Sequence, residues 1–298
     1  MDLEQQFEGV LQFIDNNLSE NLHFERLAVE AGVPFNHFEF IFYSLYHTQV
    51  ADYIALLRNI EAAQTLGFDK SVSILDVAKA AGYSSAVEFT QAFTSSIGQT
   101  PEAFRQAPDW GNFFIKQQPL KTLSQGHNTL TDVDVNIEAI RLDRLDLVLI
   151  KHRGPKEYLS QTMQALSAFK KAHQLPLSDC RRFNFIYNLP QNMNTDHAID
   201  IGVSITPTKA SELQVVMADS KYFNVTALQS GIYATFSHKG SEIALQDKIN
   251  YLYHTWLTKN DFTLTEHPLV FEHVERIEDA NDVHVKVYLA VTPHLECM

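Results

Sequence analysis

The sequence predicts a multidomain protein in which an all-α domain is followed by an α+β domain with an antiparallel sheet. Three observations lead to this prediction. Apolar residues recur at helical spacing through about the first hundred residues. Two stretches of this segment repeat each other about fifty residues apart, too regularly for chance. From about residue 131, short apolar strands alternate with two amphipathic helices, and one turn motif recurs eighty-six residues later.

The composition fits two globular domains. The chain has 298 residues, of which 45% are hydrophobic and 20% are charged, and this is too apolar for a disordered chain. The N-terminus lacks the basic start and apolar run of a signal peptide, and no apolar segment approaches the roughly 20 residues that span a bilayer. Only two cysteines are present, far apart in the sequence. We therefore expect a cytoplasmic protein without a disulfide framework.

The N-terminal helices are predicted from apolar stripes and from the residues that end them. The stripes predict helices over residues 3–18, 25–31, 36–45 and 49–66, and a later one over about 88–97. Gly32 suits a left-handed turn at a helix end, because it has no Cβ. Ser73 suits a helix N-cap, and Thr100 suits a cap before Pro101 in the first turn.

The repeat defines the architecture of this domain. Residues 27–32 recur as 77–82, and residues 37–42 recur as 88–93. In both copies of the first segment, small alanines allow two short helices to approach steeply, and a glycine makes the turn between them. We therefore predict a double helix-turn-helix domain over residues 1–107, with one long helix joining its two units.

Specific residues carry a family resemblance over about residues 7–107. The matching positions are Ile14-Asp15-x-Asn17-Leu18, Leu27-Ala28 through Gly32, Val77-Ala78 through Gly82-Tyr83, Phe89-x-x-x-Phe93 and Gly98-x-Thr100-Pro101-x-x-Phe104-Arg105. With these the domain resembles the DNA-binding domain of the AraC/XylS family of bacterial transcription regulators. The resemblance implies that the second helix of each unit enters the major groove of DNA. The candidate DNA contacts are Asn36, His37, Arg58, Ser85, Gln91, Thr94 and Ser95.

The charge of this domain conflicts with DNA binding. Residues 1–108 hold five basic and fourteen acidic residues, a net charge of −9. The family usually has basic residues where this sequence has Phe40, Tyr43 and Gln91, so the electrostatic attraction to phosphates is mostly missing. The alternative is that the fold persists without DNA binding and that a face formed by Phe40 and Tyr43 contacts a protein partner.

The rest of the chain predicts a linker and a second domain. Residues 108–130 are rich in Gln, Pro, Gly, Asn and Ser, which is typical of a linker, although residues 113–115 are apolar enough to dock. In the domain over residues 131–298, strands are predicted at 146–152, 183–188, 199–205, 232–238, 269–274 and 283–291, with helices at 158–172 and 241–259. Their order predicts two β-α-β-β halves around a pseudo-two-fold axis, with one antiparallel sheet and helices on one face.

This domain also carries the motifs of a known family over about residues 133–292. The matching residues are His152-x-Gly154-Pro155, Gly231-x-Tyr233-Ala234, His238-x-Gly240, Trp256-Leu257, Pro268-x-x-Phe271-Glu272 and Tyr288-Leu289. The domain resembles the GyrI-like effector-binding domains that are fused to AraC-type modules and occur in multidrug-sensing regulators. The resemblance implies that a glutamate at the position of Glu272 binds cationic, aromatic compounds.

Glu272 is the leading candidate for ligand binding. It lies in an otherwise apolar strand, where an ionised carboxylate is costly unless it meets a cation. Tyr187, Tyr233, Phe271 and Trp256 are the aromatic candidates around that cation. Tyr187 is the counterpart of Glu272 in the other half of the repeat. Two alternatives remain open, since Glu272 could face solvent at a sheet edge and Trp256 fits a helix core.

The combined prediction is a ligand-responsive, AraC-like transcription regulator that binds double-stranded DNA and a small, cationic and amphipathic effector. A second hypothesis is a protein that sequesters a small molecule or binds a protein partner without reading DNA. A third is a hydrolase of reactive small molecules in which Glu272 acts with Tyr187 or Tyr233. No catalytic residue, metal site or cofactor is predicted, because glycine-rich nucleotide loops are absent and the histidines lack paired helical spacing.

Overall fold

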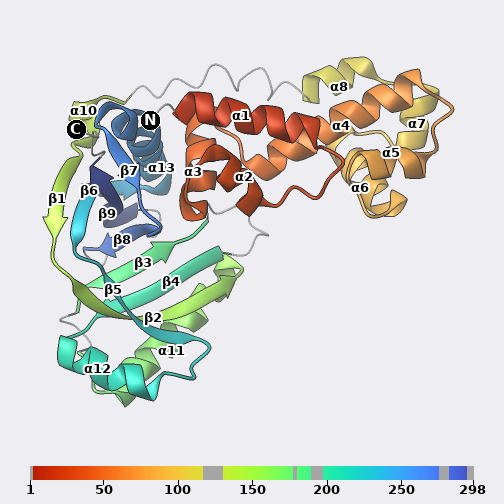
Figure 1. Ribbon diagram of the computed structural model, residues 1–298. Coiled ribbons are helices and arrows are strands. Elements are labelled where there is room, and N and C mark those ends of the chain that lie inside the picture. The colour runs from red at the N-terminus through yellow and green to blue at the C-terminus, as the bar shows by residue number, and fades with distance from the viewer. Residues whose placement is uncertain (1–2, 117–129, 177–179, 189–196, 275–281, 294–298) are drawn as a thin grey trace. The chain divides into compact units, whose positions relative to one another are not determined.

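The chain forms two compact units. The computed structural model describes residues 3–116, 130–176, 180–188, 197–274 and 282–293 (Figure 1). One unit holds Asp2–Val33 and Phe42–His127, and the other holds Pro34–Ile41 and Asn128–Met298. All the described strands belong to the second unit. Across the described ranges, every helix is too short or too polar to span a membrane.

The predicted N-terminal helices are confirmed, with their ends displaced by a few residues. These helices are α1 (Leu3–Asn16), α2 (Phe24–Ala31), α3 (Phe35–Tyr46), α4 (Val50–Phe68), α5 (Ile74–Ala80), α6 (Ala86–Ile97) and α7 (Pro101–Gln106), and an eighth helix that was not predicted, α8 (Trp110–Lys116), follows them. Gly32 follows α2 in the left-handed conformation, with φ of 63°. Ser73 caps α5 through the amide of Asp76, and Thr100 caps α7 with a proline in the first turn.

Helix α8 falls in the segment for which the sequence predicts a linker. Its Phe113 is buried in the core that α4–α7 form, with its ring centroid 6.0 Å from that of Phe104. Trp110 packs edge-on against Phe104 with centroids 5.1 Å apart. The expected docking of residues 113–115 is therefore seen at Phe113, while residues 117–129 of the predicted linker lie outside the described residues.

Replacing Phe113 with alanine tests whether α8 is part of this core. We expect Phe113→Ala to lower the free energy of unfolding by about 3 kcal/mol, because it leaves a cavity against Phe104. Phe114→Ala is the matched control, since Phe114 is 64% exposed and its removal should cost under about 0.5 kcal/mol. Chemical denaturation of both variants measures the difference, and equal stabilities would show that α8 is not a core element.

The second unit is built on one antiparallel sheet. The strands are β1 (Glu138–Leu142), β2 (Leu145–Gly154), β3 (Arg182–Ile186), β4 (His197–Ser204), β5 (Phe223–Leu228), β6 (Gly231–Ser241), β7 (Phe262–Leu264), β8 (Leu269–His273) and β9 (Asp282–Pro293). The helical segments are α10 (Asp132–Val135), η1 (Lys156–Tyr158), α11 (Leu159–Ala172), α12 (Pro207–Val216), α13 (Glu242–Tyr251), the π-helical turn η2 (Leu252–Trp256) and α14 (Leu257–Lys259). The strand order is β1-β6-β9-β8-β3-β4-β2-β5, with β7 beside β9.

The predicted duplication is confirmed. One half is β2-α11-β3-β4 and the other is β6-α13-β8-β9, and the halves meet where β3 pairs with β8 (Figure 1). All the described pairings are antiparallel. The structure adds α10, β1, β5, β7 and α12, for which no element was predicted.

The two faces of this sheet differ. On one, here called the helix face, Val148, Ile150 and Ile201 form a core with residues of α11 and α12. The opposite face carries Glu272, which is directly across from Phe183, and is called the Glu272 face. Residues directly opposite each other in an antiparallel pair share a face, so the register assigns each side chain to one face or the other.

Candidate functional site

Glu272 is held by an arginine and a tyrosine. The Nε and Nη2 atoms of Arg181 donate to the two carboxylate oxygens at 2.6 and 2.9 Å, and the Tyr288 hydroxyl donates to Oε2 at 2.6 Å. Burial opposes ionisation of Glu272, but these hydrogen bonds and the charges of Arg181 and Lys286 outweigh it, so its pKa lies below the usual value. Glu272 therefore meets a cation, as its burial requires, and that cation belongs to the protein.

Two further contacts complete this group of residues. Lys286 lies directly across from Glu272 in the β8–β9 register, with its Nζ 5.5 Å from the centre of the Tyr288 ring. The Arg181 guanidinium lies 5.1 Å from the centre of the Phe183 ring. We call Glu272, Arg181, Tyr288 and Lys286 the Glu272 cluster.

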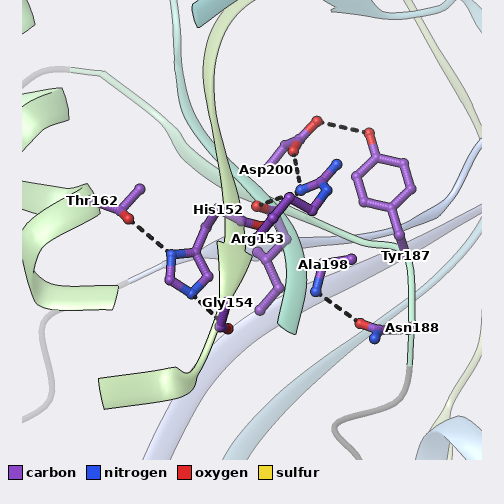
Figure 2. Close-up of polar contacts among 9 residues, drawn as sticks. His152, Arg153, Gly154, Thr162, Tyr187, Asn188, Ala198 and Asp200 are labelled. Carbon is purple, nitrogen blue, oxygen red and sulfur yellow. Dashed lines mark hydrogen bonds and ion pairs between the residues drawn. The ribbon is translucent and has the colours of Figure 1, made fainter. Parts of the chain in front are cut away.

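A second cluster with the same kinds of side chain lies on the same face, because Asp200 is directly across from Phe185 and Glu272 is directly across from Phe183. Figure 2 shows its Arg153, Tyr187 and Asp200. Asp200, which is 3% exposed, accepts hydrogen bonds from Arg153 Nη1 at 2.8 Å and from the Tyr187 hydroxyl at 3.0 Å. The Arg153 guanidinium lies 5.1 Å from the centre of the Tyr187 ring, and Lys151 is directly across from Asp200. Burial and the Asp200 carboxylate raise the pKa of Tyr187 above its usual value. We call Asp200, Arg153, Tyr187 and Lys151 the Asp200 cluster.

The motif His152-x-Gly154 positions the Asp200 cluster. The His152 ring bonds Thr162 Oγ1 at 2.8 Å and the Gly154 carbonyl at 3.2 Å, which ties the end of β2 to α11 (Figure 2). Gly154 has a φ of 148°, a conformation that favours glycine. His238 makes a similar contact at the corresponding turn, where its Nε2 bonds the carbonyl of Ser241 at 3.1 Å. These histidines therefore shape the two strand-to-helix turns.

The predicted ligand residues separate into two groups. Tyr187 and Tyr233 share the Glu272 face, and the Tyr233 hydroxyl donates to the Gln229 carbonyl at 2.8 Å. Phe271 lies on the helix face, because neighbouring residues of a strand point to opposite faces. Trp256 is 7% exposed and stacks on Phe262 with ring centroids 5.3 Å apart, as its alternative role in a helix core predicts. The structure thus brings three of the five candidates together on one face.

A cavity of about 240 Å³ lies on the helix face. Phe271, Leu245 and Ile249 form part of its mainly apolar wall. Asn184 and His273 also line it and are hydrogen-bonded to each other at 2.9 Å. Burial lowers the pKa of His273, so its ring is neutral at pH 7. The cavity suits an uncharged apolar group better than an ion.

Several predicted DNA contacts have structural partners in their own unit. Arg58 donates from Nε to the Leu18 carbonyl at 2.9 Å and from Nη2 to the Glu20 carbonyl at 2.8 Å. This holds α4 against the turn after α1. Ser85 accepts the amide of Glu88 and caps α6, and Thr94 donates to the carbonyl of Thr90.

Gln91 and Ser95 are the exposed candidates on α6. They are four residues apart, so they lie on one side of the helix. If this module contacts DNA through α6, these two side chains are free to turn toward it without loss of a cap. Their role in DNA binding stays a prediction.

The candidates on α3 engage other residues of the unit that contains Pro34–Ile41. His37 is fully buried, with hydrogen bonds to the Tyr253 hydroxyl at 2.8 Å and the Thr265 carbonyl at 3.1 Å, and burial lowers its pKa to about 4. Asn36 donates to the Glu266 carbonyl at 2.9 Å. Phe40 is 2% exposed and stacks on Tyr253, so it does not form the exposed protein-binding face predicted for it with Tyr43.

The sequence did not identify Arg181, Arg153, Asp200, Lys151, Lys286 or Tyr288 as site residues, although Tyr288 belongs to one of the family motifs. Arg153 lies within a motif that the sequence analysis quoted, but as an unspecified position. One signal in the sequence could have identified Tyr288. Side chains alternate along a strand, so Tyr288 lies on the same side of β9 as Lys286. The arginine partners could be found only from the strand register.

The fold and these clusters define a two-module chain in which helix-turn-helix units accompany a duplicated β-α-β-β domain, the organisation of a ligand-responsive regulator. Residues 134–292 match the family model described as "GyrI-like small molecule binding domain", and residues 27–107 match a "Helix-turn-helix domain". The chain therefore belongs to the GyrI-like family and carries an AraC-type helix-turn-helix module, as both resemblances predicted.

Curated relatives cover both modules. The chain is 24% identical to the "Right origin-binding protein" of Escherichia coli strain K12 over 276 residues, 88% of each chain. It is 30% identical to the "Probable transcription factor PqrA" of Proteus vulgaris over 99 residues, which are 33% of this chain and 80% of that protein. A solved AraC-type transcriptional regulator from Chromobacterium violaceum is 26% identical, with a TM-score of 0.32, over 35% of this chain and 96% of that one.

Proposed function

We propose that this protein regulates transcription in the bacterial cytoplasm by binding DNA through its helix-turn-helix module, under the control of a small effector held by its GyrI-like domain. The proposal rests on one observation: a duplicated helix-turn-helix domain and a small-molecule-binding domain occupy the same chain. The names of two curated relatives, an origin-binding protein and a transcription factor, support DNA as the partner. No catalytic step is part of the proposal.

The effector is proposed to bind on the Glu272 face. Two half-exposed arginines lie there, Arg153 and Arg181, each paired with a carboxylate and each lying over an aromatic ring. These groups offer both charge and aromatic contact to a ligand. The wall of the cavity on the helix face is mainly apolar, so it has few groups that could hold a charged effector in one orientation.

A second candidate function is ligand binding without DNA recognition. One observation favours it, the net charge of −9 over residues 1–108, because surplus carboxylates repel the DNA duplex at long range. The helix-turn-helix module would then serve as a scaffold.

Selection of sequences from a random double-stranded DNA pool tests the proposal and separates the two functions. With the full chain, we expect one sequence to be enriched and its binding to weaken as salt rises from about 50 to 200 mM. The weakening should be shallower than for a basic regulator, since few lysines and arginines are present to release counterions. Absence of binding even at low salt would support the second candidate instead.

A further inference from the structure

Both clusters on the Glu272 face hold more cations than anions. Each sets one arginine and one lysine against a single carboxylate. The other charged residues that the register assigns to this face, Glu138, Lys239 and Asp282, lie near the ends of their strands. Each cluster is therefore positive, although the chain has a net charge of −13. Local positive charge in an acidic chain favours an anionic ligand by Coulomb attraction.

The arginines also keep hydrogen-bond donors that the clusters do not use. Arg181 contacts Glu272 through Nε and Nη2, and Arg153 contacts its acceptors through Nη1. A guanidinium group has five N–H donors in a planar fork, so donors remain on both side chains. The two arginine side chains are 48% and 47% exposed. An anion can therefore reach them without breaking an existing contact.

A cationic ligand could not bind Glu272 without breaking existing contacts. It must displace the two-point contact of Arg181 and then approach Lys286, which lies directly across from the carboxylate. Tyr288 already donates to the same carboxylate oxygen as Arg181 Nη2. The resemblance predicted a cationic effector on the basis of Glu272 alone, without the arginine and the lysine that neutralise it.

We propose that the Glu272 face binds an anionic effector with apolar surface, whose charge is held by Arg181 and Lys286. This inference rests on the proposed function, because it names the chemical class of the effector. Glu272 forms its ion pair with Arg181, and within the described residues Lys286 has no carboxylate at ion-pair distance. The positive charge of Lys286 is therefore available to a ligand. Arg181 supplies directed hydrogen bonds, and Glu272 fixes the orientation of its guanidinium.

Two probes of nearly the same size and shape test the charge preference. Tetraphenylborate is an anion and tetraphenylphosphonium is a cation, and both present four phenyl groups. A difference between their affinities for the full chain therefore reports the effect of the charge. Calorimetric titration is expected to show at least tenfold tighter binding of the borate. Lys286→Met should reduce that preference about tenfold, because it removes the uncompensated charge. Arg182→Met and the cavity-filling Leu245→Trp, both on the helix face, should leave the preference unchanged.

The outcomes separate this inference from the proposed function. If the phosphonium binds more tightly and Glu272→Gln abolishes that binding, the anion preference is wrong and the ligand site on the Glu272 face stands. If neither probe binds, or if Lys286→Met and Glu272→Gln both leave the affinities unchanged, the site on this face is wrong as well. If Leu245→Trp alone abolishes binding, the ligand site is the helix-face cavity.

Discussion

Replacement of Arg153 by methionine is expected to lower the free energy of unfolding by about 3 kcal/mol at pH 7. The variant keeps the aliphatic bulk but leaves the Asp200 carboxylate, which is 3% exposed, without its ion-pair partner. Removing one partner of a buried pair costs about 3–5 kcal/mol, because the other charge stays buried. The lower end applies here, since Arg153 itself is 47% exposed and the Tyr187 hydroxyl still donates to Asp200.

A second substitution tests the cause. Asp200→Asn removes the charge while its amide oxygen can still accept the Tyr187 hydroxyl. The double variant Arg153→Met/Asp200→Asn should therefore unfold within about 1 kcal/mol of the parent. Arg182→Met is the control for loss of an exposed arginine on β3, with an expected change under about 0.5 kcal/mol. Urea denaturation measures all four proteins, and a double variant less stable than Arg153→Met would refute the buried-charge explanation.

Much of the fold could be predicted because its signals are local. Gly32, Ser73 and Thr100 end or cap helices through contacts with residues three or four positions away, so the sequence shows them directly. The duplication of the sheet domain could be predicted for a different reason. Gly154 and Gly240 both have positive φ, and each lies at or next to the end of a strand that leads into a helical segment.

The missed elements had weaker signals. Strand β5 alternates apolar and polar residues, but over only six residues. Helix α12 is an exception, because Thr206 caps it and Pro207 is in its first turn, the same signal that marked α7, so it could have been predicted. Strand β5 pairs with β2, whose residues are about eighty positions earlier in the chain, so no local pattern fixes its partner.

The candidate site could be predicted only in part. Glu272 stood out because it interrupts an apolar strand, and that signal is local. Its partner Arg181 is 91 residues away, and Asp200 is 47 residues from Arg153. Such pairs depend on the β3–β8 and β2–β4 registers, which alternation within one strand does not give. The charge of the ligand therefore had to be inferred from the resemblance, and our proposal of the opposite sign depends on Arg181 and Lys286, which only the registers place beside Glu272.

Adding basic residues to α6 is expected to strengthen DNA binding about a hundredfold at low salt. Gln91 and Ser95 are exposed and lie on one side of the helix that the family places in the major groove. Gln91→Arg/Ser95→Lys adds two cations there without removing the Ser85 cap. Each new phosphate contact releases counterions, so the slope of log affinity against log salt should steepen by about 0.9 per contact.

A control must carry the same net charge elsewhere in the module. Gln106→Arg/Gln64→Lys adds two cations at exposed positions of α7 and α4, outside α6. It should raise affinity less than tenfold and leave the salt slope nearly unchanged, because long-range attraction is screened within about 10 Å at 0.1 M salt. Fluorescence anisotropy with a labelled duplex measures both effects. Equal gains for the two double variants would mean that α6 does not approach the DNA and that only net charge limits binding.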